Sequence, residues 1–128
     1  MIFVDTSVWV AAFRSGEGAE GVRLQVLLDG DVVALAAPVR IEILVGAGNR
    51  ERPKLRRVLS ALPLFYPTDA AWERIDEWTD RAGRAGERFG FADLLIGAIA
   101  AENDSPIWSL DLDFVRMAKL GFVTVDRG

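Results

Sequence analysis

Five carboxylates stand out in the sequence because of their positions relative to apolar segments. Asp5 follows the first apolar run of the chain, and Asp111 and Asp113 follow another. Glu42 and Asp93 lie within stretches that are otherwise nearly uncharged. Two unit charges ~4 Å apart repel by about 4 kcal/mol at an effective dielectric constant of about 20. Carboxylates gathered in one pocket would therefore need protons or a cation between them.

The composition restricts the chemistry that these acids can perform. The 128 residues include no Cys and no His, which excludes disulfides, Cys/His zinc sites and Ser-His or Cys-His triads. Oxygen ligands alone favour Mg²⁺ or Mn²⁺, which prefer octahedral shells and usually retain several waters. A water activated by such a metal and a neighbouring carboxylate can attack a phosphodiester in line. The acids together are therefore consistent with metal-dependent hydrolysis of phosphodiester bonds.

Each acid taken alone also has a simpler interpretation. Asp5, Asp69 and Asp111 stand where helix N-caps are expected after strands, and a carboxylate at Asp93 would favourably meet the dipole of its helix. Glu42 is not needed as a cap, and its simpler role is a solvent-exposed side chain. Asp69 is expected to act only as a cap, because its strand should lie at the edge of the sheet. The functional interpretation depends on the other acids converging.

The elements that must position these acids follow from hydrophobic periodicity. Short apolar runs alternate with longer segments of helical period, which is typical of βα units around a parallel sheet. With 51% hydrophobic residues, the chain is predicted to form a single α/β domain over residues 1–128, with helices on both faces of a central parallel sheet. Five strands are predicted, at residues 2–4, 32–36, 64–66, 107–109 and 123–125. Helices are predicted at residues 7–13, 19–28, 39–46, 53–62, 69–85, 91–102 and 114–119.

The predicted elements bring some of the acids to one edge of the sheet. Ligands of open parallel sheets bind outside the carboxyl ends of the strands, where the strand order reverses. Asp5 follows the first predicted strand and Asp111 the fourth, so both overhang one crevice if these strands are neighbours. Asp93, Gly97 and Ala100 share one face of their helix, and the small residues would let this helix approach another element closely.

Four segments in this order resemble the PIN-domain family, and more narrowly the VapC-type toxins. They are IFVDTSVW (2–9), IE (41–42), FADLLIGAIA (91–100) and SLDLDF (109–114). The resemblance extends over the whole chain. It implies the strand order 3-2-1-4-5, which would make the first and fourth strands neighbours.

The resemblance also implies roles for individual residues. Asp5, Asp93 and Asp111 would hold Mg²⁺, with Mn²⁺ as a possible substitute, while Glu42 would orient or deprotonate the attacking water. Asp113 is a frequent fifth acid that shares or replaces the role of Asp111. The hydroxyls that follow the first acid would orient a carboxylate or a water; they belong to Thr6 and Ser7.

The implied function is that of a toxin in a type II toxin–antitoxin system. Such a protein is a Mg²⁺-dependent endoribonuclease that hydrolyses structured RNA, often tRNA or rRNA, and leaves 5′-phosphate and 3′-hydroxyl ends. The family further implies a homodimer and a cognate VapB-like antitoxin that blocks the acidic groove.

The charge balance bears on how RNA would be bound. The chain has 19 acidic and 15 basic residues, a formal net charge of −4. Removing the four acids of the family pattern leaves 15 of each sign, so RNA must meet local basic patches. The densest basic run covers residues 50–57 and includes Arg52, and a second group contains Arg84 and Arg88. The alternative is that these are solvated helix faces paired with acids.

Two other functions remain open from the residues alone. A phospho-acceptor receiver domain shares the architecture and an acidic Mg²⁺ pocket, but it requires paired acids after the first strand and a Lys after the fifth. Here Asp5 stands alone and no Lys follows residues 123–125. A non-enzymatic RNA or protein binder would keep the fold without catalysis. The start of the chain has no secretory signal and no stretch reaches the ~20 apolar residues of a membrane span, so a cytoplasmic location is expected.

Overall fold

A computed structural model of the chain, which describes residues 1–126, contains a four-stranded parallel sheet in the order β3-β2-β1-β4. The central strand β1 pairs with two neighbours, with Phe3 in register with both Ala34 and Ile107. Strands β1, β2 and β4 are buried along their length, as predicted for strands covered on both faces. The strands are β1 (Ile2–Val4), β2 (Val33–Ala36), β3 (Leu64–Phe65) and β4 (Ile107–Trp108).

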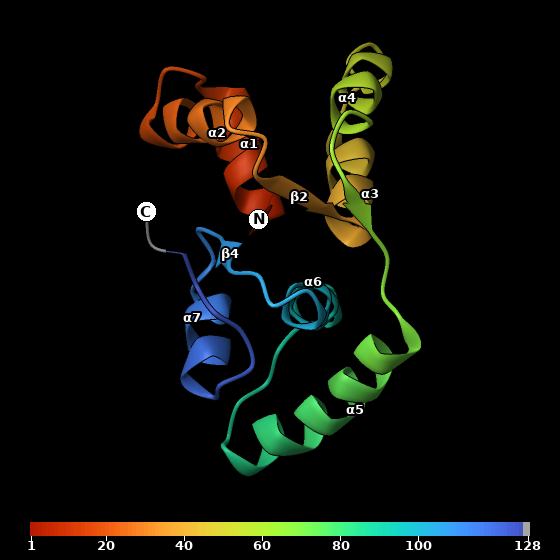
Figure 1. The fold of residues 1–128 in the computed structure, drawn as a ribbon, viewed down its shortest axis with the longest axis vertical. Helices are drawn as coiled ribbons and strands as arrows, with labels where there is room; N and C mark the ends of the chain where they lie inside the picture. The colour runs from red at the N-terminus through yellow and green to blue at the C-terminus, as the bar shows by residue number, and fades with distance from the viewer. Residues whose placement is uncertain (127–128) are drawn as a thin grey trace.

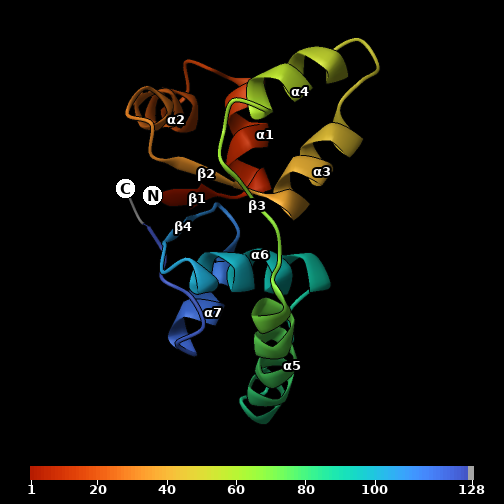
Figure 2. The same cartoon turned by 45° about the vertical axis from the view of Figure 1, so that its right-hand side comes forward.

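Helices cover both sides of the sheet, as predicted. In Figures 1 and 2, α1 to α4 lie on one side of the strands and α5 to α7 on the other. The order of elements along the chain follows the predicted alternation, with most boundaries within two residues of expectation. The helices are α1 (Thr6–Arg14), α2 (Ala19–Asp29), α3 (Ala37–Gly46), α4 (Arg52–Leu59), α5 (Asp69–Arg84), α6 (Phe91–Glu102) and α7 (Leu112–Lys119).

The predicted fifth strand at residues 123–125 is wrong as a strand. The segment does lie beside β4, but it forms a single parallel bridge between Ile107 and Val125. The Ile107 amide donates to the Thr124 carbonyl at 2.9 Å, and the Asp126 amide donates to the Ile107 carbonyl at 2.8 Å. Because β4 is only two residues long, it offers too little backbone for a longer ladder. The predicted order therefore holds for four strands, with a bridge in the fifth place.

The end of α4 and the N-cap of α5 also differ from prediction. Helix α4 ends at Leu59 instead of residue 62, because the chain turns before Pro63 to enter β3. The N-cap of α5 is Thr68, whose hydroxyl accepts a hydrogen bond from the Ala71 amide at 3.1 Å. Asp69, which was expected to be this cap, is instead the first residue of the helix. No described helix is both long and apolar enough to span a membrane.

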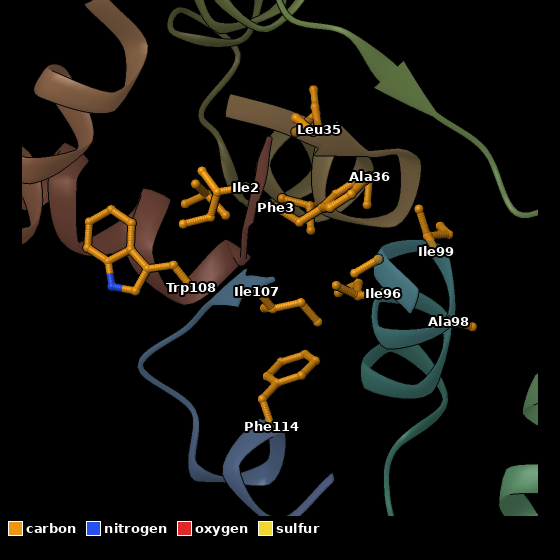
Figure 3. Close-up of a cluster of buried hydrophobic side chains, with 14 of the residues drawn as sticks. Ile2, Phe3, Leu35, Ala36, Ile96, Ala98, Ile99, Ile107, Trp108 and Phe114 are labelled. Carbon is orange, nitrogen blue, oxygen red and sulfur yellow. The ribbon is translucent and has the colours of Figure 1, made fainter. Parts of the chain in front are cut away.

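The core joins the sheet to α6 and α7. Figure 3 shows Ile107 of β4 with Ile96 of α6 and Phe114 of α7 gathered beneath the sheet, and all three are at most 1% exposed. Gly97 lets α6 approach its neighbours closely: a Cβ atom there would lie 2.6 Å from Met117 Cε and 3.2 Å from Val123 Cγ1. The close approach predicted for the small-residue face of this helix is confirmed. It places the first turn of α6, with Asp93, next to the start of α7.

Candidate active site

The site begins where β1 and β4 end side by side. The Asp5 amide continues their pairing by donating to the Trp108 carbonyl at 2.9 Å. Asp5 is then the N-cap of α1 and is only 5% exposed. Its Oδ2 accepts hydrogen bonds from Ser7 Oγ and from Ser109 Oγ, both at 2.7 Å. The adjacency of the two strands therefore fixes the orientation of the first carboxylate.

Ser109 is a site residue that the sequence analysis did not assign. Its hydroxyl donates to Asp5 and accepts from the Asp111 amide at 2.9 Å, so it links the two strand ends. Ser7 has a similar arrangement, since its hydroxyl accepts from the Leu110 amide at 3.0 Å. A signal was present in the sequence: Ser109 precedes Asp111 by two residues, as Ser7 follows Asp5 by two. Ser7, predicted from the resemblance to orient a carboxylate or a water, donates to the Asp5 carboxylate.

Three carboxylates from two helices converge beside this strand edge. One oxygen each of Asp93, Asp111 and Asp113 lies within 4.8 Å of the other two. Asp93 lies in the first turn of α6, and Asp111 is the N-cap of α7, where its Oδ1 accepts from the Asp113 amide at 2.9 Å. We call these three residues the acidic group. Residues far apart in the sequence are thus brought close together, although the group contains Asp113 and lacks the predicted members Asp5 and Glu42.

The acidic group changes the ionisation of Asp93. Partial burial, together with the charges of Asp111 and Asp5, raises the pKa of Asp93 from 3.8 to about 7. A hydrogen bond with Asp113 acts in the same direction. The effect of Asp5 on this pKa shows that it is electrostatically part of the site, although it lies outside the acidic group itself. The site therefore favours the uptake of positive charge.

One cation of the chain already contacts the acidic group. The Arg116 side chain, on α7, donates to Asp113 Oδ1 through Nη2 and to Glu87 Oε2 through Nη1, the latter at 2.6 Å. These carboxylates raise the pKa of Arg116 above its already high value. Its guanidinium carbon also lies 5.1 Å from the centroid of the Phe89 ring. The sequence analysis did not single out Arg116, because a basic residue on a helix face carries no distinguishing signal.

Glu42 is connected to the end of β1 through a hydrogen bond with Thr6. It is exposed on α3, and its Oε1 accepts from Thr6 Oγ1 at 2.7 Å. Thr6 directly follows Asp5, so one hydroxyl connects Glu42 to the end of β1. Glu42 also lines a groove of about 630 Å³ whose walls include Phe13 and Leu55. It does not belong to the three-carboxylate group.

The basic residues predicted to bind RNA have different surroundings. The Arg52 guanidinium donates to the carbonyls of Leu44 and Ala47 at 3.0 and 2.8 Å, so it satisfies backbone groups at the end of α3. Arg84 and Arg88 are exposed, and Arg88 lines a cavity of about 390 Å³. The segment that carries Arg88 leads directly into α6. Of the three, Arg84 and Arg88 have the freer side chains.

The donor set of the acidic group fits a hard divalent cation. Its members offer carboxylate oxygens, which are the ligands that Mg²⁺ and Mn²⁺ prefer. The raised pKa of Asp93 indicates that the protein's own groups do not fully compensate the negative charge. In the described residues, the hydrogen bonds to the Asp5 side chain all end on Oδ2, which leaves Oδ1 for a cation.

Comparisons with known proteins agree with this arrangement. The PIN domain family model matches residues 2–120. Ribonuclease VapC11 of Mycobacterium tuberculosis is 34% identical over 125 residues, which cover 94% of this chain and 93% of that protein. Among solved structures, VapBC2 of Rickettsia felis bound to a promoter DNA fragment has a TM-score of 0.80 at 19% identity, with 98% of both chains covered.

A second solved structure has the same fold. VapBC-5 of Mycobacterium tuberculosis, a member of the VapBC family of toxin–antitoxin systems, has a TM-score of 0.72 at 19% identity and covers 98% of this chain and 97% of that one. The match to the family model extends from β1 to the last helix. On this evidence the chain belongs to the PIN-domain family, and within it to the VapC ribonucleases.

Proposed function

We propose that the protein is a Mg²⁺-dependent endoribonuclease and the toxic component of a type II toxin–antitoxin system. The observation that carries this proposal is the convergence of Asp93, Asp111 and Asp113 beside the buried Asp5. Ribonuclease VapC11, which is similar over nearly the whole chain, supports the activity. The receiver-domain alternative is not supported, since Asp69 lies in the first turn of α5 and outside the acidic group.

Some residues of the site would bind the cation, and others orient a carboxylate that binds it. Asp5, Asp93 and Asp111 would hold the cation, with Asp113 as a further acid beside them. Ser7 and Ser109 orient the Asp5 carboxylate by donating to one of its oxygens. When bound, a divalent ion lowers the pKa of the attacking water and stabilises the charge that develops on the phosphate oxygens.

Glu42 and Thr6 are proposed to act on the attacking water. Glu42 is exposed and so is accessible to a water that approaches a bound phosphodiester. The Thr6 hydroxyl, 2.7 Å from Glu42 Oε1, holds the carboxylate in one orientation and leaves its second oxygen to accept a proton. Attack by water instead of the ribose 2′-hydroxyl leaves 5′-phosphate and 3′-hydroxyl ends.

The substrate is proposed to be structured RNA, such as tRNA or rRNA, bound by local positive charge. Arg84 and Arg88 are exposed at the end of α5 and in the segment before α6, close in sequence to Asp93. Arg52 would add charge only, because its guanidinium already satisfies the end of α3. RNA contacts by such residues position the phosphate backbone without reading sequence.

The proposed partners follow from the family. A VapB-like antitoxin would block the acidic groove, as the VapBC toxin–antitoxin complexes among the structural neighbours suggest. A homodimer and a location in the cytoplasm are proposed on the same basis.

The proposal is tested by cleavage of total RNA with purified protein. Asp93→Asn and chelation by EDTA are each expected to abolish cleavage while the thermal unfolding curve still shows a folded protein. Asp69→Asn is the matched control: it makes the same chemical change on an exposed residue of α5 and should leave cleavage intact. Full activity in EDTA would contradict the metal dependence, and fragments with 5′-hydroxyl ends would contradict attack by water.

A further inference from the structure

Arg116 contacts the acidic group through Asp113. Neither the family pattern nor the proposed function gives Arg116 a role. It follows Asp113 by three residues on α7, so its side chain returns to the first turn of the same helix. There it donates to Asp113 through Nη2. Its Nη1 donates to Glu87 Oε2 at 2.6 Å, and its guanidinium lies over the ring of Phe89.

The contacts of Arg116 come from two different parts of the chain. Asp113 belongs to α7, whereas Glu87 and Phe89 belong to the segment between α5 and α6, which leads into Asp93. Arginine suits this position, because its planar guanidinium can donate to two carboxylates and stack on an aromatic ring at the same time. Arg116 therefore joins the start of α7 to the segment that precedes α6, and these are the two places that supply the acidic group.

The electrostatics of the acidic group explain why such a residue is needed. Asp113 lies close to Asp93, with one carboxylate oxygen of each within 4.8 Å of the other. Two carboxylates at this separation repel. The Asp113 side chain is 33% exposed, so it can turn into solvent if nothing holds it. The Arg116 guanidinium holds the Asp113 side chain and compensates its charge.

We propose that Arg116 is a positioning residue for the cation site: it holds the Asp113 carboxylate at the acidic group, and Glu87 and Phe89 in turn hold Arg116. The inference rests on the proposed function in assigning the acidic group to a divalent cation. It goes further in making Glu87, which provides no ligand, a determinant of cation affinity. The segment before α6 would then have two roles: Glu87 and Phe89 hold Arg116, and Arg88 binds RNA.

The first test is the dissociation constant of Mn²⁺, measured by calorimetry on the full chain without RNA. Loss of an outer residue that orients a ligand typically weakens metal binding 10- to 100-fold. Arg116→Gln is expected to weaken Mn²⁺ binding by about 10-fold and Glu87→Gln by roughly 3-fold. Arg116→Lys is expected to lie between Arg116→Gln and the unaltered protein, since lysine keeps the charge but lacks the planar fork.

A double-mutant cycle tests whether Arg116 acts through Asp113. If it does, Arg116→Gln combined with Asp113→Asn binds Mn²⁺ no more weakly than Asp113→Asn alone. Multiplying effects would overturn the inference, because Arg116 would then act independently of Asp113. Tighter Mn²⁺ binding by Arg116→Gln would also overturn it, because the loss of a repulsive charge would outweigh the loss of positioning.

A matched control is available at the other end of α6. Arg74 pairs with Glu102 at 3.0 Å and lies 6.0 Å from the centroid of the Trp78 ring, so it repeats the chemistry of the Arg116 contacts away from the site. Arg74→Gln and Glu102→Gln should leave Mn²⁺ affinity unchanged.

The outcomes separate the inference from the proposed function. No Mn²⁺ binding by the unaltered protein contradicts the proposed function. If the unaltered protein binds Mn²⁺ and Arg116→Gln binds it equally tightly, the inference alone is contradicted. If Arg116→Gln does not fold, Glu87→Gln decides: unchanged affinity in that variant overturns the inference, and weakened affinity supports it.

Discussion

Asp93 is the residue whose ionisation responds most strongly to the site. Its burial, followed by the charges of Asp111 and Asp5, raises its pKa from 3.8 to about 7. An acid whose pKa is higher in the folded than in the unfolded state binds more protons when folded. This group therefore lowers the free energy of unfolding of the metal-free protein as the pH rises from about 4 to about 7.

The Asp93→Asn variant tests this linkage. In EDTA, the unaltered protein is expected to lose thermal stability between about pH 4 and about pH 7, because Asp93 must ionise beside other carboxylates. The variant should show a smaller loss, since an amide does not ionise. Below about pH 7 protons compete with Mn²⁺ for the same carboxylate. The Mn²⁺ affinity of the unaltered protein should therefore decrease as the pH is lowered. Equal pH dependence of unfolding in the two proteins would show that Asp93 does not carry the effect.

The site residues differ in how far the sequence could reveal them. Asp5 and Asp111 could be predicted because parallel strands must end at the same edge of a sheet. Ser109 could not be assigned with the same ease, since its partner Asp5 lies 104 residues away. The sequence does not reveal the contacts that Arg116 and Arg52 make with other elements: one donates to Glu87 and the other to the end of α3 because of side-chain directions set by packing.

At the scale of elements, the close approach of α6 to α7 sets the geometry of the acidic group. Gly97 occupies a position where a Cβ would meet Met117, Val123 and Trp78, at 2.6, 3.2 and 3.4 Å. These side chains come from α7, the segment after it, and α5. A larger residue at Gly97 would push α6 away from α7 and separate Asp93 from its partners.

Gly97→Val is therefore expected to reduce both stability and cation affinity. Overpacking of a close-packed core typically costs about 1–3 kcal/mol, which is measurable by chemical denaturation. Gly83→Ala is the matched control, because a Cβ at that position in α5 meets nothing within 4 Å. It should leave the free energy of unfolding unchanged or slightly raise it. Unaltered stability of Gly97→Val would mean that the contact between α6 and α7 is looser than described.

The elements themselves were largely predictable from periodicity. Helix α6 begins and ends at the predicted residues, because its apolar stretch is bounded by Gly90 and Asn103. The predicted fifth strand was wrong because an apolar run of β-branched residues indicates an extended segment but not the length of its neighbour. Pairing needs a partner, and β4 provides only Ile107 for the bridge to Val125.

At the scale of the whole molecule, the charge balance restricts how RNA can be bound. The net charge is −4, and the four acids of the family pattern account for the entire excess of acidic over basic residues. An acidic protein that binds RNA must therefore do so through local positive charge, and its affinity should depend on salt through few phosphate contacts. Two surfaces could make these contacts. One contains Arg84 and Arg88 near the site, and the other contains the exposed residues of α4.

The salt dependence of RNA binding distinguishes these surfaces. For single-stranded regions, log K falls with log salt concentration with a slope of about −0.7 for each phosphate neutralised. In an Asp93→Asn background that prevents cleavage, replacing both Arg84 and Arg88 with Gln should reduce the steepness of the slope by roughly 1.4. Replacing Arg56 and Arg57 on α4 removes the same charge and should leave the slope unchanged. The opposite pattern would place the RNA on α4, away from the segment that leads into the acidic group.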